Sequence, residues 1–332
     1  MKKVAIVCIS IMLLFVSGCY NGGSFTTMDS VSTPVVSVVS TDGNANASPT
    51  PVVNAEFDFT DVNLEEAVRD QLGKSVGPIY TEDIKSMKVL KARVYSIRDV
   101  KDLTEFTSLE ELDLFGNRIT DLTPLSALKN LRKLNISQNY STSIAGTKGM
   151  DLTPLKGLSN LEELYIEKDV VYSVDALSGL TNLKILSLKN NNISDVSPLS
   201  QLVNLTYLDL GNNFYTVGFD EFGISDISPL SSLTGLEYLD ISGNIISSIA
   251  PISSLANLKS LYTSDNYLGD ITAVSELQSL ELLDVSNNLI TSFDIISQLS
   301  SLKTLLYEQN PIEDYVSIDA FLLTHKGNGI DQ

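Results

Sequence analysis

Apolar residues recur with a period of 22 residues over most of this 332-residue chain. Each unit begins with the spacing Leu-x-x-Leu-x-Leu, carries Asn three residues later, and continues with apolar residues about three positions apart. The alternation at the end of that spacing indicates a short strand with one buried face. One unit cannot bury its apolar side alone, so consecutive units must stack around a continuous core. The units begin at Met87, Leu109, Leu131, Leu161, Leu183, Leu205, Leu236, Leu258, Leu280 and Leu302.

The recurring Asn stands where the chain leaves the strand and turns inward. Backbone groups lose their strand partners there, and a carboxamide offers two donors and an acceptor to satisfy them. The pattern is broken by Tyr95 in the first unit and by Asp169 in the fourth. An ionised carboxylate cannot donate, so we expect a local irregularity at Asp169. The sequence predicts a ladder of Asn117, Asn139, Asn191, Asn213, Asn244, Asn266, Asn288 and Asn310.

These features are the signature of the leucine-rich repeat. The predicted fold class is an α/β repeat, a curved solenoid with parallel strands on the concave face and a helical N-terminal cap. Proline within the three-residue spacing predicts 3₁₀ turns on the convex face. Two units are longer, by about eight residues from Tyr140 and by about nine after Asn213, so two loops should project from the same edge of the sheet.

The N-terminus has the features of an export signal. Residues 1–18 carry two lysines and then an apolar run that is too short to span a bilayer, which predicts a signal peptide. The sequence Val-Ser-Gly-Cys at 16–19 resembles the lipobox of bacterial lipoproteins, which implies a lipid on Cys19 and a location on the extracellular face of the cell membrane. An ordinary cleaved signal peptide with an incidental Cys is the alternative. Residues 19–55 are rich in Ser, Thr and Pro and predict a disordered tether.

The chain turns globular after the tether. Residues 56–86 predict a helical cap, in which Asn63 and Thr81 can each cap a helix and Gly73 can end the first one. Residues 87–312 hold the repeats. Residues 313–332 predict a C-terminal cap, because apolar residues recur there with helical spacing.

Several motifs resemble the internalin family of bacterial surface proteins. They are Asn-Leu-Glu at 63–65 with Ala-Val-Arg at 67–69, and Asp-Leu-Thr-Pro-Leu at 121–125, which recurs at 151–155 and in a variant form at 195–199. The resemblance covers residues 57–312. It implies a binding protein that uses the concave face to contact a host or partner protein. Internalins commonly carry a further domain and a wall-sorting tail after the repeats. This chain instead carries the lipobox-like motif that ends at Cys19.

The remaining composition argues against several classes of function. There are 22 basic and 41 acidic residues, for a net charge of −19, which disfavours a nucleic-acid partner. The single histidine is His325, and there is no glycine-rich phosphate loop and no recognisable catalytic triad. We therefore predict a protein that is no enzyme, that needs no cofactor or metal, and that acts as a monomer.

Outward-pointing strand residues form the concave face, and their positions follow from the repeat. Aromatic residues collect there over the units that begin at Leu205, Leu236 and Leu258, as is usual for binding hot spots. Asp209 and Asp240 should face each other as like charges. Either a cation bridges the two carboxylates or solvent surrounds them. The predicted ligand-binding residues are Tyr207, Tyr238, Tyr262, Phe214, Tyr267, Tyr165, Asp209 and Asp240.

The sequence therefore predicts a membrane-anchored surface lipoprotein that binds a protein ligand through its concave face, in adhesion or host interaction. The alternative is a lipoprotein that binds carbohydrate or a cell-wall polymer, because exposed tyrosines suit sugars as well. A structural spacer without a ligand is the third hypothesis.

Overall fold

The computed structural model describes residues 54–139, 149–313 and 315–324. Cys19, the predicted signal peptide and most of the predicted tether lie outside these residues, as do the loop from Tyr140 and His325. Among the described residues, none of the helices has the length and apolarity needed to cross a bilayer.

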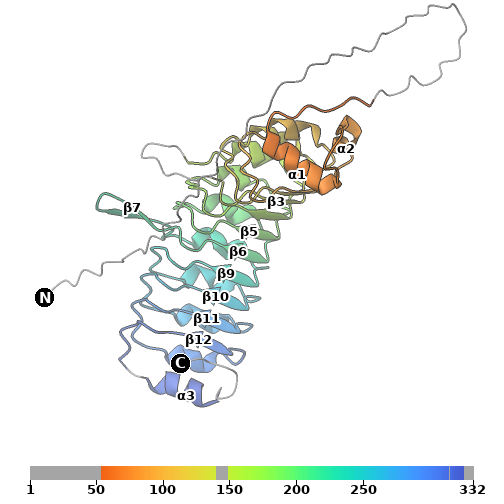
Figure 1. Ribbon diagram of the computed structural model, residues 1–332. Coiled ribbons are helices and arrows are strands. Elements are labelled where there is room, and N and C mark those ends of the chain that lie inside the picture. The colour runs from red at the N-terminus through yellow and green to blue at the C-terminus, as the bar shows by residue number, and fades with distance from the viewer. Residues whose placement is uncertain (1–53, 140–148, 314, 325–332) are drawn as a thin grey trace, which may run out of the picture. The chain divides into compact units, whose positions relative to one another are not determined.

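The predicted fold class is confirmed: the described repeats form one parallel sheet of ten strands, stacked in chain order (Figure 1). Every pair of neighbours keeps one register, first residue against first residue, as with Tyr207 and Tyr238. Each strand begins two residues after the start of its unit. The strands are β1 (Val89–Lys91), β2 (Glu111–Asp113), β3 (Lys133–Asn135), β4 (Glu163–Tyr165), β5 (Ile185–Ser187), β6 (Tyr207–Asp209), β9 (Tyr238–Asp240), β10 (Ser260–Tyr262), β11 (Leu282–Asp284) and β12 (Thr304–Leu306).

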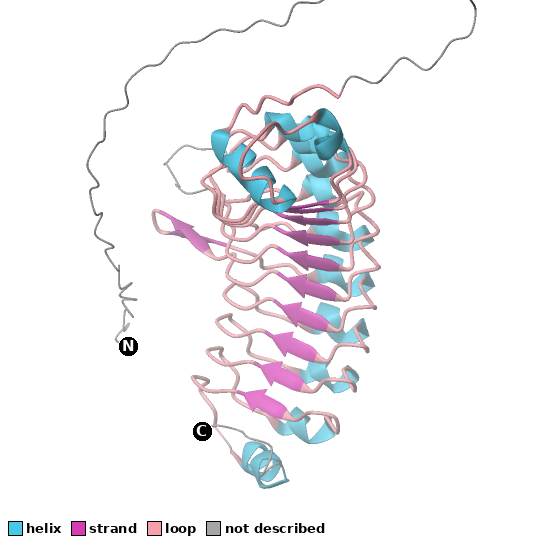
Figure 2. Ribbon diagram, turned by 45° about the vertical axis from the view of Figure 1, so that its right-hand side comes forward, coloured by secondary structure: helices cyan, strands magenta, loops and turns pink. Residues whose placement is uncertain are grey.

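Short 3₁₀ helices occupy the side opposite the strands, as the proline spacing predicts (Figure 2). Proline stands in the first turn of five of them, where its missing N–H would have no partner in any case. The 3₁₀ helices of the described residues are η1 (Lys101–Glu105), η2 (Thr123–Ala127), η3 (Thr153–Gly157), η4 (Asp175–Leu177), η5 (Ser197–Gln201), η6 (Ser228–Ser232), η7 (Ala250–Ser254), η8 (Thr272–Glu276) and η9 (Asp294–Gln298).

The core lies between the sheet and the 3₁₀ helices and runs through the whole stack. The middle residue of each strand points inward, and Leu112, Leu186 and Leu239 are fully buried. Each buried leucine contributes roughly 1.5–3 kcal/mol relative to an exposed one. The first and third residues of each strand point outward, and together these residues of the ten strands form what we call the sheet face.

The predicted helical cap is present at the N-terminal end, but its helices begin earlier than expected. Helix α1 (Val62–Leu72) is capped by Asp61, whose carboxylate accepts hydrogen bonds from the backbone of Asn63 and Leu64; Asn63 is not the cap. Gly73 ends the helix in the left-handed conformation, as predicted. Helix α2 (Thr81–Lys85) follows Tyr80, which takes the capping position predicted for Thr81.

Asp61 also ties this cap to the first coil. Its second oxygen accepts the backbone N–H groups of Arg98 and Asp99 at 2.8 and 2.9 Å. Burial alone would raise the pKa of Asp61, but the four backbone donors outweigh it and hold the pKa below its usual value. At the other end, helix α3 (Val316–Thr324) buries Ile318 and Phe321 and packs on η9.

The expected irregularity at Asp169 is found in the backbone. Where the ladder position is Asn and both flanking residues are described, only the preceding residue has a positive φ, as Asn190 does. Around Asp169 both neighbours do, Lys168 at 60° and Val170 at 55°. The first repeat, with Tyr95 at the ladder position, shows the same pair of positive φ values at its flanking residues. A ladder position without Asn is therefore accommodated by a strained neighbour on its C-terminal side.

The insertion after Asn213 is an antiparallel hairpin and not the loop that the repeat spacing predicts. Strand β7 (Tyr215–Val217) pairs with β8 (Asp220–Phe222) around Gly218 and Phe219. Gly218 has a φ of 66°, at the place where a two-residue hairpin turn favours glycine. The hairpin projects from the edge at which the sheet strands end (Figure 2), so β6 still pairs directly with β9.

Candidate binding surface on the sheet

The asparagine ladder lies beneath the ends of the strands and holds them in place. Asn213, which is fully buried, donates from Nδ2 to the carbonyl groups of Leu188 and Leu210 at 3.3 and 2.8 Å. Its Oδ1 accepts the backbone N–H of Ile193 at 3.0 Å. Each such carboxamide joins two consecutive coils, and the other Asn residues of the ladder make the same bonds. The strands that carry the sheet face are thereby held rigidly from below.

Three tyrosines of adjacent strands are in contact on this face. The rings of Tyr207 and Tyr238 stack at a centroid distance of 4.2 Å and an interplanar angle of 9°. Tyr262 joins them from the next strand, 5.4 Å from Tyr238 and tilted by 43°. All three rings are half-buried, so each still offers surface to a ligand. We call Tyr207, Tyr238 and Tyr262 the tyrosine trio.

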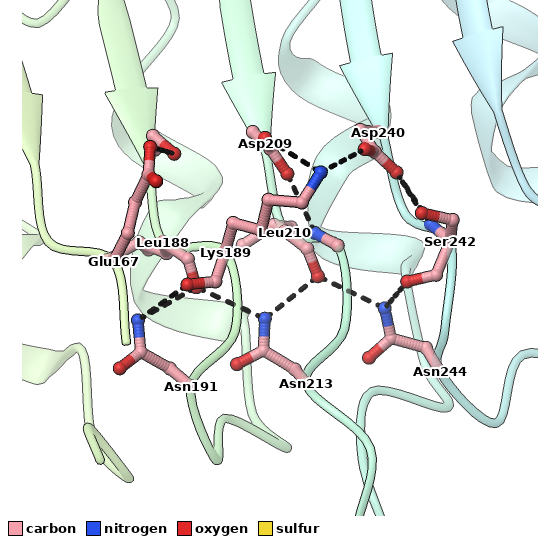
Figure 3. A network of polar contacts seen from close by, with 12 residues as sticks. Glu167, Leu188, Lys189, Asn191, Asp209, Leu210, Asn213, Asp240, Ser242 and Asn244 are labelled. Atoms are coloured by element: carbon pink, nitrogen blue, oxygen red, sulfur yellow. Dashed lines mark hydrogen bonds and ion pairs between the residues drawn. The ribbon is translucent and has the colours of Figure 1, made fainter. Parts of the chain in front are cut away.

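Asp209 and Asp240 face each other beside the trio, as the register requires. Each side chain is only 6 % exposed, so the expectation that solvent surrounds them is wrong. The ammonium group of Lys189 lies between them, 3.8 Å from Asp209 and 3.3 Å from Asp240 (Figure 3). The bridging cation is thus a side chain of the protein itself.

Backbone and side-chain donors complete the enclosure of these carboxylates. Gly211 donates its N–H to Asp209 at 2.9 Å, and the backbone of Ser242 donates to Asp240 at the same distance. A Cβ at Gly211 would lie 3.1 Å from both oxygens of Asp240, a tight contact that glycine avoids. In the described part of the chain, no group of three or more His, Cys, Asp or Glu side chains could hold a metal ion.

Burial sets the protonation behaviour of this surface. It raises the pKa of Asp209 to about 6, against the lowering effect of the Gly211 N–H and despite the neighbouring Lys189. Burial, and then the neighbouring Tyr207 and Asp240, also raise the pKa of Tyr238. The trio is therefore uncharged near neutral pH, and its hydroxyl groups remain donors.

Tyr165 lies on the sheet face but outside the trio. It is the third residue of β4, two strands from β6, and its hydroxyl donates to Glu163 at 3.1 Å. Lys133 pairs with the same glutamate at 2.7 Å and lies 5.8 Å from the centre of the Tyr165 ring. Burial and Glu163 raise the pKa of Tyr165 to about 12. This part of the face is thus occupied by internal ion pairs.

Comparison with known proteins places this geometry in a family. A model described as Leucine Rich repeats (2 copies) matches residues 107–146, 181–216 and 235–276. An internalin (InlF) from Listeria monocytogenes is 31% identical, with a TM-score of 0.64 and 79% of each chain covered. Internalin C2 of the same organism is 29% identical, with a TM-score of 0.54, and the match covers 80% of this chain and all of that one. No curated protein matches the chain.

The chain belongs to the internalin-like leucine-rich repeat proteins. The functional domain of InlJ from Listeria monocytogenes, which includes a cysteine ladder, is also similar, at 26% identity and a TM-score of 0.64. The match covers 79% of this chain and 53% of that one. This internalin-like chain builds its ladder from Asn, and its two cysteines lie before the repeats, at Cys8 and Cys19.

The structure separates Phe214 and Tyr267 from the trio, although all five are among the predicted ligand-binding residues. Both follow a ladder Asn, so they lie beyond the end of their strands and not on the sheet face. Their side chains are 41 % and 44 % exposed. The hydroxyl of Tyr267 donates to Glu221 of the hairpin at 2.9 Å. The internalin-like fold thus carries two distinct aromatic regions, one on the sheet and one along the strand-end edge.

Sequence reasoning missed the contacts that hold the hairpin. Tyr215 stacks on Phe222 across the hairpin at 5.1 Å, and Tyr172 meets the ring of Tyr215 edge-on at 5.8 Å. Tyr172 comes from the irregular repeat around Asp169, far back in the sequence. The sequence signal that could have indicated a hairpin is the run of aromatic and β-branched residues Tyr215, Thr216 and Val217 directly before Gly218, with Phe222 after it.

Proposed function

We propose that this protein is a bacterial surface lipoprotein that captures a protein ligand through the sheet face at the tyrosine trio. Three contacting, half-buried tyrosine rings on a rigid sheet are the observation that carries this proposal. Tyrosine supplies a large contact area with few rotatable bonds, and rings that already stack lose little further freedom on binding. The internalin-like fold supports a role in binding and not in catalysis.

The surroundings of the trio favour a ligand that carries positive charge. Asp209, Asp240 and Asp284 occupy the third position of three nearby strands, while Lys189 is the cation between the first two. The net charge of −19 adds a long-range attraction for a basic surface. The partly buried carboxylate of Asp284, which lies opposite Tyr262 in the register, and the aromatic ring beside it are also suited to a Lys or Arg side chain of the partner.

The test is a double substitution, Tyr207→Ala with Tyr238→Ala. Because neither ring lies in the core, the protein should stay folded while ligand capture weakens at least tenfold. Tyr207→Phe with Tyr238→Phe is the matched control, since it keeps the stacked rings and should keep most of the binding. Undiminished capture by the alanine double variant would place the ligand elsewhere.

Site-specific crosslinking can identify the protein ligand directly in whole cells. A photoreactive amino acid in place of Ser260, beside the trio on β10, should capture the ligand there. The same group in place of Ser231, on η6 at the opposite side, is the control and should capture nothing specific. Equal capture at both positions would contradict binding through the sheet face.

We place the protein on the outer face of the cytoplasmic membrane, attached through a lipid on Cys19. The motif at residues 16–19, followed by a tether, supports this attachment, and adhesion or host interaction is the role that such display would serve. Cys19→Ala should leave the protein unprocessed or release it from the membrane. Mass spectrometry that finds an unmodified Cys19 in the mature chain would contradict the attachment, whatever the sheet face binds.

A further inference from the structure

A second concave site lies along the strand-end edge, away from the sheet face. It is a groove of about 400 Å³, within the range of small-ligand sites. Three exposed apolar side chains line it: Phe214, Tyr267 and Leu289. Exposed polar side chains of Asn212, Asp265 and Asn287 line it as well. We call these six residues and the space between them the strand-end groove.

The polar row has a simple backbone origin. Each of these three residues precedes a ladder Asn and has a φ between 50° and 56°, a conformation that Asn and Asp tolerate better than most residues. The coil between Asn212 and Asp265 has Gly243 at this position, also with a positive φ. The fold therefore explains why short polar residues or glycine stand here, and it explains nothing about the apolar row.

The apolar row has no such explanation. Phe214, Tyr267 and Leu289 directly follow a ladder Asn and are 41 %, 44 % and 55 % exposed, so they add little to the core. Arg118 and Asn192 occupy the same position in earlier coils, which shows that the repeat does not require an apolar residue there. Apolar side chains gathered beside a groove are a common mark of a binding site.

The groove retains hydrogen-bonding capacity. The side chain of Asn287 donates to Oδ1 of Asp265, which leaves the second N–H of that carboxamide and the second oxygen of the carboxylate outside this bond. The carboxamide of Asn212 is exposed where it lines the groove. A row of two aromatic side chains and Leu289 thus runs beside a row of amide and carboxylate groups, with neighbouring coils roughly 4.8 Å apart.

We propose that the strand-end groove binds an uncharged glycan, at a site separate from the one that captures the protein ligand. The negative face of an aromatic ring attracts the C–H bonds of a sugar ring, while amides and carboxylates exchange hydrogen bonds with hydroxyl groups. No cation of the described chain lines the groove to balance Asp265. Together with the net charge of −19, this disfavours acidic glycans.

The proposal can be tested by calorimetric titration of the full-length protein with linear tetrasaccharides. Two of these are neutral, one of β-linked glucose and one of β-linked N-acetylglucosamine. The third is acidic and consists of uronic acid residues. At least one neutral tetrasaccharide should bind, and the acidic series should bind at least tenfold more weakly. Tyr267→Ala should weaken neutral binding at least tenfold, and Leu289→Ala should weaken it about threefold. Failure of every neutral tetrasaccharide to bind, or a preference for the acidic series, would overturn the proposal.

Two control variants separate this site from other roles of the same residues. Tyr267→Phe removes the hydrogen bond to Glu221 but keeps the ring, so it should retain binding within twofold. If it instead behaves like Tyr267→Ala, the residue acts by holding the hairpin and the ring is no sugar platform. Tyr238→Ala on the sheet face should leave glycan binding unchanged. A loss of glycan affinity in this variant would mean that the glycan binds at the sheet face as well, and would overturn the proposal of a separate site.

Discussion

The sheet face at the tyrosine trio and the hairpin formed by β7 and β8 are both aromatic and acidic, yet they are supported in different ways. The trio stands on strands that are paired on both sides, and a buried ladder and a buried ion network lie beneath them. The hairpin is held by its own two strands and by contacts with Tyr172 and Tyr267. Phe219 at its tip is fully exposed.

The difference shows how a repeat fold separates stability from variation. Residues within the period are coupled to both neighbouring coils, so a change there affects the whole stack. Residues inserted after a ladder Asn are coupled mainly to each other, since the ladder already satisfies the backbone on either side. Substitutions should therefore have large effects under the trio and small effects in the hairpin.

The largest effect should follow Lys189→Met, which leaves the buried carboxylates of Asp209 and Asp240 without their cation. We expect a loss of about 2–4 kcal/mol in the free energy of unfolding, measured by urea denaturation. Lys259→Met is the control, because Lys259 and Glu237 form an exposed, solvent-screened pair that contributes little to stability. Equal losses in the two variants would contradict a buried network.

Asn213→Ala tests whether the ladder continues undisturbed beneath the hairpin. Removing this carboxamide leaves the backbone groups of Leu188, Leu210 and Ile193 without their partner, at a cost of roughly 1–3 kcal/mol. Thermal unfolding should shift accordingly, and by a similar amount in Asn191→Ala, one coil earlier. An unchanged melting temperature for Asn213→Ala would mean that the hairpin has taken over the role of the ladder.

Asp209→Asn tests the protonation of the network. Because the folded-state pKa of Asp209 is about 6 and its usual value is 3.8, the folded state holds this proton more tightly. Wild-type stability should therefore fall as the pH rises from about 4 to about 6, by up to about 2 kcal/mol from this group. The variant lacks the contribution of this proton to the free energy of unfolding, so its stability relative to wild type should increase over that pH range. Parallel stability curves from pH 4 to 7 would refute the raised pKa.

The smallest effect should follow Phe219→Ser at the tip of the hairpin. A fully exposed side chain contributes little to folding, so the free energy of unfolding should change by less than about 0.5 kcal/mol. Denaturation curves of the two proteins should therefore superimpose. A loss above about 1 kcal/mol would show that the hairpin is part of the cooperative stack, and would remove the contrast between the two regions.

The sequence by itself determined the solenoid. The 22-residue period sets the strands, their shared register and the inward-facing leucines, because each depends only on alternation and on burial against a similar neighbour. It also indicated the ladder positions, the irregularity at Asp169, and the three sheet tyrosines over adjacent coils. It did not determine which residue caps each helix of the N-terminal cap. Two candidates stand close together in both cases, Asp61 and Asn63 for α1, and Tyr80 and Thr81 for α2.

Only the tertiary structure decided which long side chain stands between Asp209 and Asp240, and that the added residues after Asn213 pair as a hairpin. The Lys189 contact to Asp240 spans 51 residues, and the bond from Tyr267 to Glu221 spans 46. Contacts of this kind depend on the rotamers of flexible side chains and on an insertion that breaks the period. Periodicity therefore places each backbone position, and packing between coils one or two apart in the stack decides which side chains meet there.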